Sequence, residues 1–310
     1  VHRPVLLSGG VVNNRGVIRA VKEIFGLEEG ELLCDDGGTI VSAAGLAVIA
    51  MERKVHVDWE RLCEDAGKDM VVSCDGMAAF CDCSREMKQQ SDGNRLPAFP
   101  YEKAKLHKTR APKPGEAMWL GVDVGSTSTN LVLIGENQEV LDYCYIRTSG
   151  NPARAVEEGL EVLKPTMDMA GTAILQTAVT GSGRYLIAKK LGTDQVLDEI
   201  TAQARAASFL NPDADTVFEI GGQDSKYISV KHGQVVDFEM NKVCAAGTGS
   251  FIEEQAGRLG IPLPEIGPMA LRAKHPVELG ERCTVLMESK IVSELAAGAG
   301  KENLCAGLCR

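Results

Sequence analysis

The stretch GVDVGSTSTN, residues 121–130, decides the fold. An apolar strand ends with Asp123, and Gly125 follows directly before three hydroxyl residues, Ser126, Thr127 and Ser128. Glycine lets the backbone turn tightly, and the amides and hydroxyls of such a turn can surround phosphate oxygens. Asp123 is then placed to hold a hydrated Mg2+, which favours a few carboxylates together with water and phosphate oxygens. The alternative is a polar β-hairpin without a ligand, since serine and glycine are common turn residues.

A second stretch, FEIGGQDSK at residues 218–226, repeats this arrangement. A strand carries Glu219, the chain turns on Gly221 and Gly222, and Gln223 and Asp224 follow as side chains that can orient a water or a metal. Two such turns in one chain favour a nucleotide site over two unrelated hairpins.

A third glycine-containing segment, Gly247, Thr248 and Gly249, precedes an expected helix over residues 250–260. Backbone amides at a helix N-terminus bind anions, so this segment is predicted to add a further phosphate contact.

The sequence around these turns has an α/β pattern. Residues 118–125, 129–136 and 139–148 read as three successive strands of an antiparallel meander. Asn151 is the expected N-cap of the next helix, with Pro152 at its first position. Strands and helices then alternate up to a second strand series at residues 216–240.

The composition excludes several classes of protein. A net charge of −10 argues against nonspecific binding to nucleic acid or anionic lipid. The longest apolar run, residues 43–51, is far shorter than the roughly 20 residues that a membrane span needs. Ten cysteines without a secretory signal fit a reducing cytoplasm, where clustered thiols bind metal or stay free. We therefore expect a cytoplasmic protein with no nucleic-acid or membrane partner.

These motifs together resemble the ATPase fold of the actin, sugar kinase and heat-shock ATPase superfamily. The resemblance implies an α/β, ribonuclease H-like fold of two subdomains, with mixed sheets around a nucleotide cleft. The SGG segment with Gly9 and Gly10 resembles the adenosine-binding turn of that superfamily. Within it, NKVCAAGTGSF at residues 241–251 and ERCTVLMESKIVSEL at residues 281–295 are similar to the activators of 2-hydroxyacyl-CoA dehydratases and the ATPase subunits of benzoyl-CoA reductase, the BadF/BadG/BcrA/BcrD type.

That family holds a 4Fe-4S cluster between two protomers, each of which gives two cysteines. The matching residues here are Cys244 and Cys283, and each precedes an expected helix. Thiolates are the usual ligands of such clusters, and helix N-termini stabilise their negative charge. Two ligands per chain require a second protomer or a tandem domain to complete the site.

The resemblance implies an anaerobic activase. ATP and Mg2+ would drive one-electron transfer from the cluster to a partner 2-hydroxyacyl-CoA dehydratase or aromatic acyl-CoA reductase. Reduced ferredoxin or flavodoxin would be the electron donor, and the chain itself would not bind the acyl-CoA.

The order of the segments departs from this family. A lone activator would end with a GG segment and a small-residue helix, and both resemble residues 5–51 at the start of this chain. We therefore predict a tandem protein: residues 1–53 form the C-terminal, adenosine-side segment of one activase-like domain, 54–115 a linker, and 116–310 a second domain without such a segment. The N-terminal segment, residues 4–50, is predicted to dock on the later domain as in a circular permutation. The family's second turn also commonly begins with aspartate, whereas Glu219 stands here, which leaves the role of Glu219 open.

Other interpretations stay open at this point. A sugar or amino-sugar kinase of the same superfamily would need an aspartate base beside a sugar pocket, and a noncatalytic scaffold would keep the fold without turnover. Cys74, Cys81 and Cys83 form a possible zinc site, but no second pair with finger spacing follows. Cys305 and Cys309 lie four residues apart and match no ligand of the family.

Overall fold

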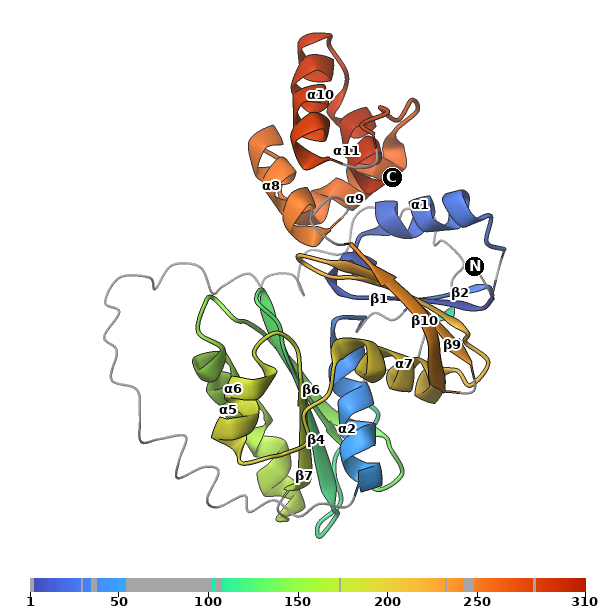
Figure 1. The fold of residues 1–310 in the computed structure, drawn as a ribbon. Coiled ribbons are helices and arrows are strands. Elements are labelled where there is room, and N and C mark those ends of the chain that lie inside the picture. Colours follow the sequence, from blue (N-terminus) through green and yellow to red (C-terminus); the bar gives the residue numbers. More distant parts are fainter. Residues whose placement is uncertain are drawn as a thin grey trace, which may run out of the picture.

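The computed structural model contains two mixed β-sheets with helices packed around them (Figure 1). Both ends of the chain lie in the half that carries the larger sheet. None of the described helices is long and apolar enough to cross a membrane. The described residues are 3–28, 30–34, 38–53, 102–103, 108–172, 174–231, 233–241, 248–280 and 283–310.

The smaller sheet has four strands in the order β6-β5-β4-β7. The predicted antiparallel meander is confirmed, and β7 joins it parallel to β4. Helix α5 (Pro152–Ala170) makes the crossover that a parallel neighbour requires, with the Asn151 side chain accepting from the Arg154 amide at its start. The strands are β4 (Met118–Val124), β5 (Ser128–Ile134), β6 (Val140–Arg147) and β7 (Ile174–Thr180).

Alternation along the strands gives this sheet two buried faces. Leu131 packs in a cluster with Leu163 of α5, whereas its neighbour Val132 packs with Ala47 of α2 (Val41–Arg53). Successive side chains of a strand point to opposite faces, so the sheet is a middle layer between α5 and α2.

The larger sheet has six strands in the order β10-β9-β8-β1-β2-β3. Two antiparallel pairings form one side, β8 with β9 and β9 with β10, and parallel pairings form the other. The strands are β1 (Val5–Ser8), β2 (Leu32–Cys34), β3 (Glu102–Lys103), β8 (Thr216–Ile220), β9 (Ser225–Lys231) and β10 (Gln234–Met240).

The N-terminal segment docks on the strands and helices that follow residue 116, as predicted. Its first strand, β1, pairs in parallel with β8 from Val5 opposite Thr216 to Ser8 opposite Glu219. β1 therefore lies inside the sheet rather than at its edge, and all four of its residues are buried.

Helix α2 of the same segment lies between the two halves of the molecule and packs on β4 and on α7 (Glu199–Leu210). All residues of α2 from Val41 to Ala50 are buried. Close approach requires glycine on both sides: a Cβ on Gly45 would lie 2.1 Å from the Ala202 carbonyl oxygen, and one on Gly121 of β4 would lie 1.8 Å from the Ala43 carbonyl oxygen. The small side chains of α2 thus allow the backbones of α7 and β4 to approach this helix closely.

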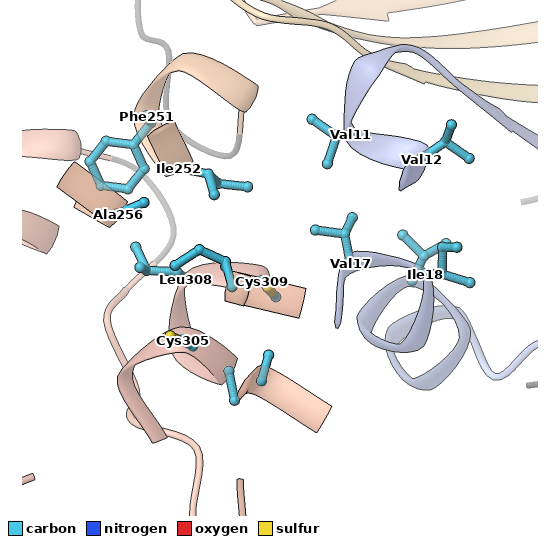
Figure 2. Close-up of a cluster of buried hydrophobic side chains, with 14 of the residues drawn as sticks. Val11, Val12, Val17, Ile18, Phe251, Ile252, Ala256, Cys305, Leu308 and Cys309 are labelled. Carbon is cyan, nitrogen blue, oxygen red and sulfur yellow. The ribbon is translucent and has the colours of Figure 1, made fainter. Parts of the chain in front are cut away.

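A second contact joins the N-terminal segment to the C-terminal helices (Figure 2). Val17 and Ile18 of α1 share one hydrophobic cluster with Phe251 and Ile252 of α8, and with Leu308. This cluster unites the start and the end of the chain in one core. The elements concerned are η1 (Gly10–Asn13), α1 (Arg15–Phe25), α8 (Gly249–Leu259), α9 (Leu263–Arg272), α10 (Thr284–Ala296) and α11 (Lys301–Cys309). The remaining elements are η2 (Gly38–Ile40) and α6 (Arg184–Leu191).

Part of the predicted linker has structure. Residues 102–103 form β3 beside β2, and the Thr109 amide donates to the Val140 carbonyl oxygen. Arg110 pairs with Glu116 and, at 2.9 Å, with Glu139. The possible zinc ligands Cys74, Cys81 and Cys83 lie outside the described residues.

Candidate nucleotide site

Two glycine turns, one from each sheet, meet in the structure. Residues 125–128 join β4 to β5, and the Gly125 amide donates to the Ser128 carbonyl oxygen at 2.8 Å. Residues 221–224 join β8 to β9, and the Gly221 amide donates to the Asp224 carbonyl oxygen at 2.9 Å. Each sheet therefore contributes one glycine turn at the end of a strand, and the two turns lie next to each other.

The turns touch through side chains and backbone. The Ser126 hydroxyl donates to Gln223 Oε1 at 2.9 Å. A Cβ on Gly222 would lie 2.8 Å from Thr127 Oγ1, so this glycine permits the close approach. The first-turn residues 125–128 and the second-turn residues 221–224 that the sequence singled out are thus brought together.

The N-terminus of α8 joins the second turn. The Gly249 amide donates to the Gly221 carbonyl oxygen at 2.9 Å, and the Ser250 amide donates to the Gly222 carbonyl oxygen at 2.8 Å. Thr248 is fully buried beside them. The first amides of α8 therefore hold the turn, while Gly247 lies outside the described residues.

Gly9 brings the N-terminal segment to the same place. Its φ of 90° lies in the region that favours glycine, and a Cβ there would lie 2.3 Å from the Ile220 carbonyl oxygen and 3.0 Å from Glu219 Oε1. A Cβ on Gly10 would have no neighbour within 4 Å in the described part of the chain. Gly9 therefore packs against the end of β8, and Gly10 leaves space beside it.

Asp123 stands at the end of β4 between these turns. Surrounding protein atoms remove water from its carboxylate, and this loss raises its pKa to about 6. The Ser42 hydroxyl of α2 donates to Asp123 Oδ2 and opposes that rise. The buried Asn130 lies directly opposite Asp123 on β5, and its Oδ1 has no hydrogen-bond partner among the described residues. Two oxygen donors, one ionisable and one unsatisfied, suit a hard cation such as Mg2+.

Lys226 forms the most buried charge cluster near the site. Its ammonium lies 2.7 Å from Glu219 Oε2, 2.8 Å from Asp224 Oδ1 and 2.9 Å from Glu199 Oε2. Burial alone would lower the pKa of Lys226, but the attraction of Glu219 and the other carboxylates raises it above its usual value. Burial raises the pKa of Glu219 to about 7, against the attraction of Lys226.

Four residues of this site, Ser42, Asn130, Glu199 and Lys226, were not expected from the sequence. Lys226 had a signal, because strand pairing of β8 with β9 sets it directly opposite Glu219. No sequence signal pointed to Ser42, because it lies 81 positions from Asp123 and contacts it only when the N-terminal segment docks.

The described cysteines fall into two groups. Cys283 is half-buried at the N-cap of α10, whose outward face carries the exposed side chains Val285 and Leu286. The other four, Cys34, Cys144, Cys305 and Cys309, are buried. Burial raises the pKa values of Cys144, Cys305 and Cys309 to about 12, 11 and 12, which makes these three poor thiolate ligands. Cys244 lies outside the described residues. In the part of the chain that the structure describes, no three His, Cys, Asp or Glu side chains are arranged so that they could hold a metal ion as they stand.

The chain is similar in sequence to a known family of ATPases and to proteins of established activity. Residues 120–310 match the model of the BadF/BadG/BcrA/BcrD ATPase family. The chain is 34% identical over 195 residues to the (R)-2-hydroxyglutaryl-CoA dehydratase activating ATPase of Acidaminococcus fermentans, a match that covers 62% of this chain and 72% of that protein. It is 28% identical over 193 residues to a subunit of the benzoyl-CoA reductase of Thauera aromatica, covering 61% of this chain and 67% of that one.

A solved structure extends the comparison to the fold. The activator of the 2-hydroxyisocaproyl-CoA dehydratase from Clostridium difficile, with bound ADPNP, is similar at a TM-score of 0.56 and 30% identity, covering 62% of this chain and 70% of that one. The predicted actin-like fold class is confirmed by this likeness and by the two mixed sheets.

Proposed function

The chain belongs to the BadF/BadG/BcrA/BcrD ATPase family, and from this premise we propose that it couples ATP hydrolysis to one-electron transfer into a partner 2-hydroxyacyl-CoA dehydratase or aromatic acyl-CoA reductase. The observation that carries the proposal is the bonding of α8 to the second phosphate turn, because α8 follows closely on Cys244 in the chain. A nucleotide-dependent shift of that turn would move the start of α8.

Each turn has a role at the ATP site in this proposal. Amides and hydroxyls of residues 125–128 bind phosphate oxygens, and Gly9 and Gly10 lie on the adenosine side. Asp123 would hold the hydrated Mg2+, and Asn130, directly opposite it on β5, would offer a second oxygen to the same site. Gln223 and Asp224 orient the attacking water, because both belong to the turn that faces Ser126. Mg2+ would supply charge neutralisation at the phosphates.

Cys244 and Cys283 are proposed to hold half of a 4Fe-4S cluster. Cys283 fits as a ligand because it is accessible at the N-terminal end of a helix, where backbone amides favour negative charge. When bound, the cluster would supply a single low-potential electron. Two thiolates per chain leave the site incomplete without a second protomer or a tandem domain, and reduced ferredoxin or flavodoxin is the proposed donor.

The chain's own contribution to coupling runs through backbone hydrogen bonds. The carbonyl oxygens of Gly221 and Gly222 accept from the first two residues of α8, so the turn and the helix move as one unit. The same helix packs through Phe251 and Ile252 into the core that α1 and α11 share. A change at the phosphates would therefore reach the C-terminal helices, including α10 and its Cys283.

The proposal is tested with anaerobic protein, a purified 2-hydroxyacyl-CoA dehydratase, a chemical reductant and ATP. The wild-type chain should hydrolyse ATP without any sugar and should activate the dehydratase only when ATP and reductant are both present. Asp123→Asn should lose both activities. Cys283→Ala should keep hydrolysis and lose activation, whereas Cys144→Ala, the matched control at a buried cysteine, should keep both.

A Cys283→Ala protein that activates the dehydratase like wild type would refute electron transfer through this chain. Hydrolysis that requires a sugar acceptor would favour the kinase interpretation instead.

A further inference from the structure

Lys226 is buried to an unusual degree for a lysine. Only 5% of the residue is exposed, and its ammonium contacts carboxylates from three elements: Glu199 at the start of α7, Glu219 on β8 and Asp224 in the second turn. The ammonium donates hydrogen bonds to Glu219 at 2.7 Å and to Asp224 at 2.8 Å, and it forms an ion pair with Glu199 at 2.9 Å.

The negative charges around Lys226 outnumber its single positive charge. Three carboxylates meet one ammonium, and Asp123 is close enough to be influenced by Lys226, Glu199 and Asp224. Without the ammonium, these carboxylates would repel one another in a place with little water. Lys226 is therefore the cation that allows the acidic groups to stay together in the protein without nucleotide.

The ammonium also fixes the geometry of the second turn. Lys226 holds Asp224, whose carbonyl oxygen accepts from Gly221 and closes the turn. Gln223, between these residues, then faces Ser126 of the first turn. Through Glu199 the same ammonium ties the turn to α7, the helix that packs on α2.

We propose that Lys226 is a positioning residue of the ATPase site, which stands in for a divalent cation among Glu199, Glu219 and Asp224 and thereby holds Gln223 and Asp224 in the arrangement that hydrolysis needs. The inference rests on the nucleotide site proposed above. In this inference the positive charge of the ammonium offsets part of the negative charge of four nearby acidic groups, Asp123, Glu199, Glu219 and Asp224.

A purely structural ion pair would behave differently. Buried ion pairs contribute little net stability, and an apolar residue of similar volume often replaces one without loss. If Lys226 served only to fill space, Lys226→Met would leave turnover near wild type.

The test compares full-length wild type, Lys226→Met and Lys226→Arg in two measurements. Nucleotide-free protein is titrated with Mn2+, and free Mn2+ is followed by its paramagnetic resonance. A further variant, Lys226→Ala, should bind one Mn2+ at least tenfold more tightly than wild type, because it removes the ammonium and leaves space among the three carboxylates, which suit such an ion. The kcat of Lys226→Met for ATP should fall about 100-fold with KM changed less than threefold, since a small misplacement of reacting groups costs that much. Lys226→Arg should recover most of both properties.

A wild-type Mn2+ affinity in Lys226→Ala, or a wild-type kcat in Lys226→Met, would overturn the inference. Should these variants fail to fold, Glu199→Gln decides, because it removes the negative charge of one of the three partners and leaves Lys226 with the other two. A tenfold fall in its kcat supports the positioning role, and an unchanged kcat refutes it. If wild type bound no ATP, the proposed nucleotide site would fail, and the Mn2+ comparison alone would then judge Lys226.

Discussion

Replacement of Gly45 by alanine tests the docking of the N-terminal segment most sharply. A Cβ at this position would lie 2.1 Å from the Ala202 carbonyl oxygen and 3.0 Å from the Ala206 Cβ. The first neighbour is backbone of α7 and has no rotamer by which to move away. α2 must therefore shift by about 1 Å, and overpacking of this kind costs about 1–3 kcal/mol.

An opposing effect reduces this cost. Alanine is favoured over glycine inside a helix by about 1 kcal/mol. Because the clash is with backbone, we take the upper part of the range and expect a net loss of about 2 kcal/mol for Gly45→Ala. At about 2 °C for each kcal/mol, the thermal midpoint should fall by about 4 °C.

Gly257 in α8 is the matched control. It is also a helical glycine, yet it is exposed, and a Cβ there would meet no atom of the described residues within 4 Å. Gly257→Ala should therefore raise the thermal midpoint, since only the helix preference acts. Thermal unfolding followed by circular dichroism measures both variants. A stabilising effect of Gly45→Ala as large as that of Gly257→Ala would show that α2 does not pack against α7 as the structure has it.

Two further predictions concern the core and the site. Ile18 lies in the cluster of Figure 2, and Ile18→Ala should lower the free energy of unfolding in denaturant by about 2–5 kcal/mol. Ile24 on the same helix is 58% exposed, and Ile24→Ala should lower it by less than about 1 kcal/mol. Equal losses in the two variants would contradict the shared core. Ser42→Ala removes a donor that favours ionised Asp123, so the pKa of Asp123 should rise from about 6 and the acidic limb of kcat/KM for ATP should move upward by about one pH unit. A limb that stays in place would show that Ser42 does not act on Asp123.

The sequence predicted the fold well where local pattern and tertiary structure agree. The meander of β4, β5 and β6 follows from alternating apolar residues and polar turns, and α5 follows from the Asn151 cap with Pro152 behind it. The docking of β1 beside β8 was predictable for another reason, since a sheet that lacks its central strand would expose apolar edges.

The candidate site was predictable only in part. Glycine turns have a local signature, so residues 125–128 and 221–224 stood out in the sequence. The contact between Ser126 and Gln223 depends on how the two sheets are placed, and no local pattern records it. Ser42 and Glu199 reach the site from helices whose own patterns report only packing. The predicted role of the first α8 amides also changed, because the carbonyl oxygens of Gly221 and Gly222 occupy two of them.

The central claim is that Cys244 and Cys283 hold an iron–sulfur cluster whose electron is released under the control of ATP. The most direct measurement is the paramagnetic resonance spectrum of reduced, anaerobic protein, recorded for wild type beside the double variant Cys244→Ala, Cys283→Ala. The account predicts a reduced-cluster signal in wild type, with iron and sulfide in equal amounts, and its loss in the variant. A variant that keeps the signal and the iron, or a wild type that has neither, would contradict it.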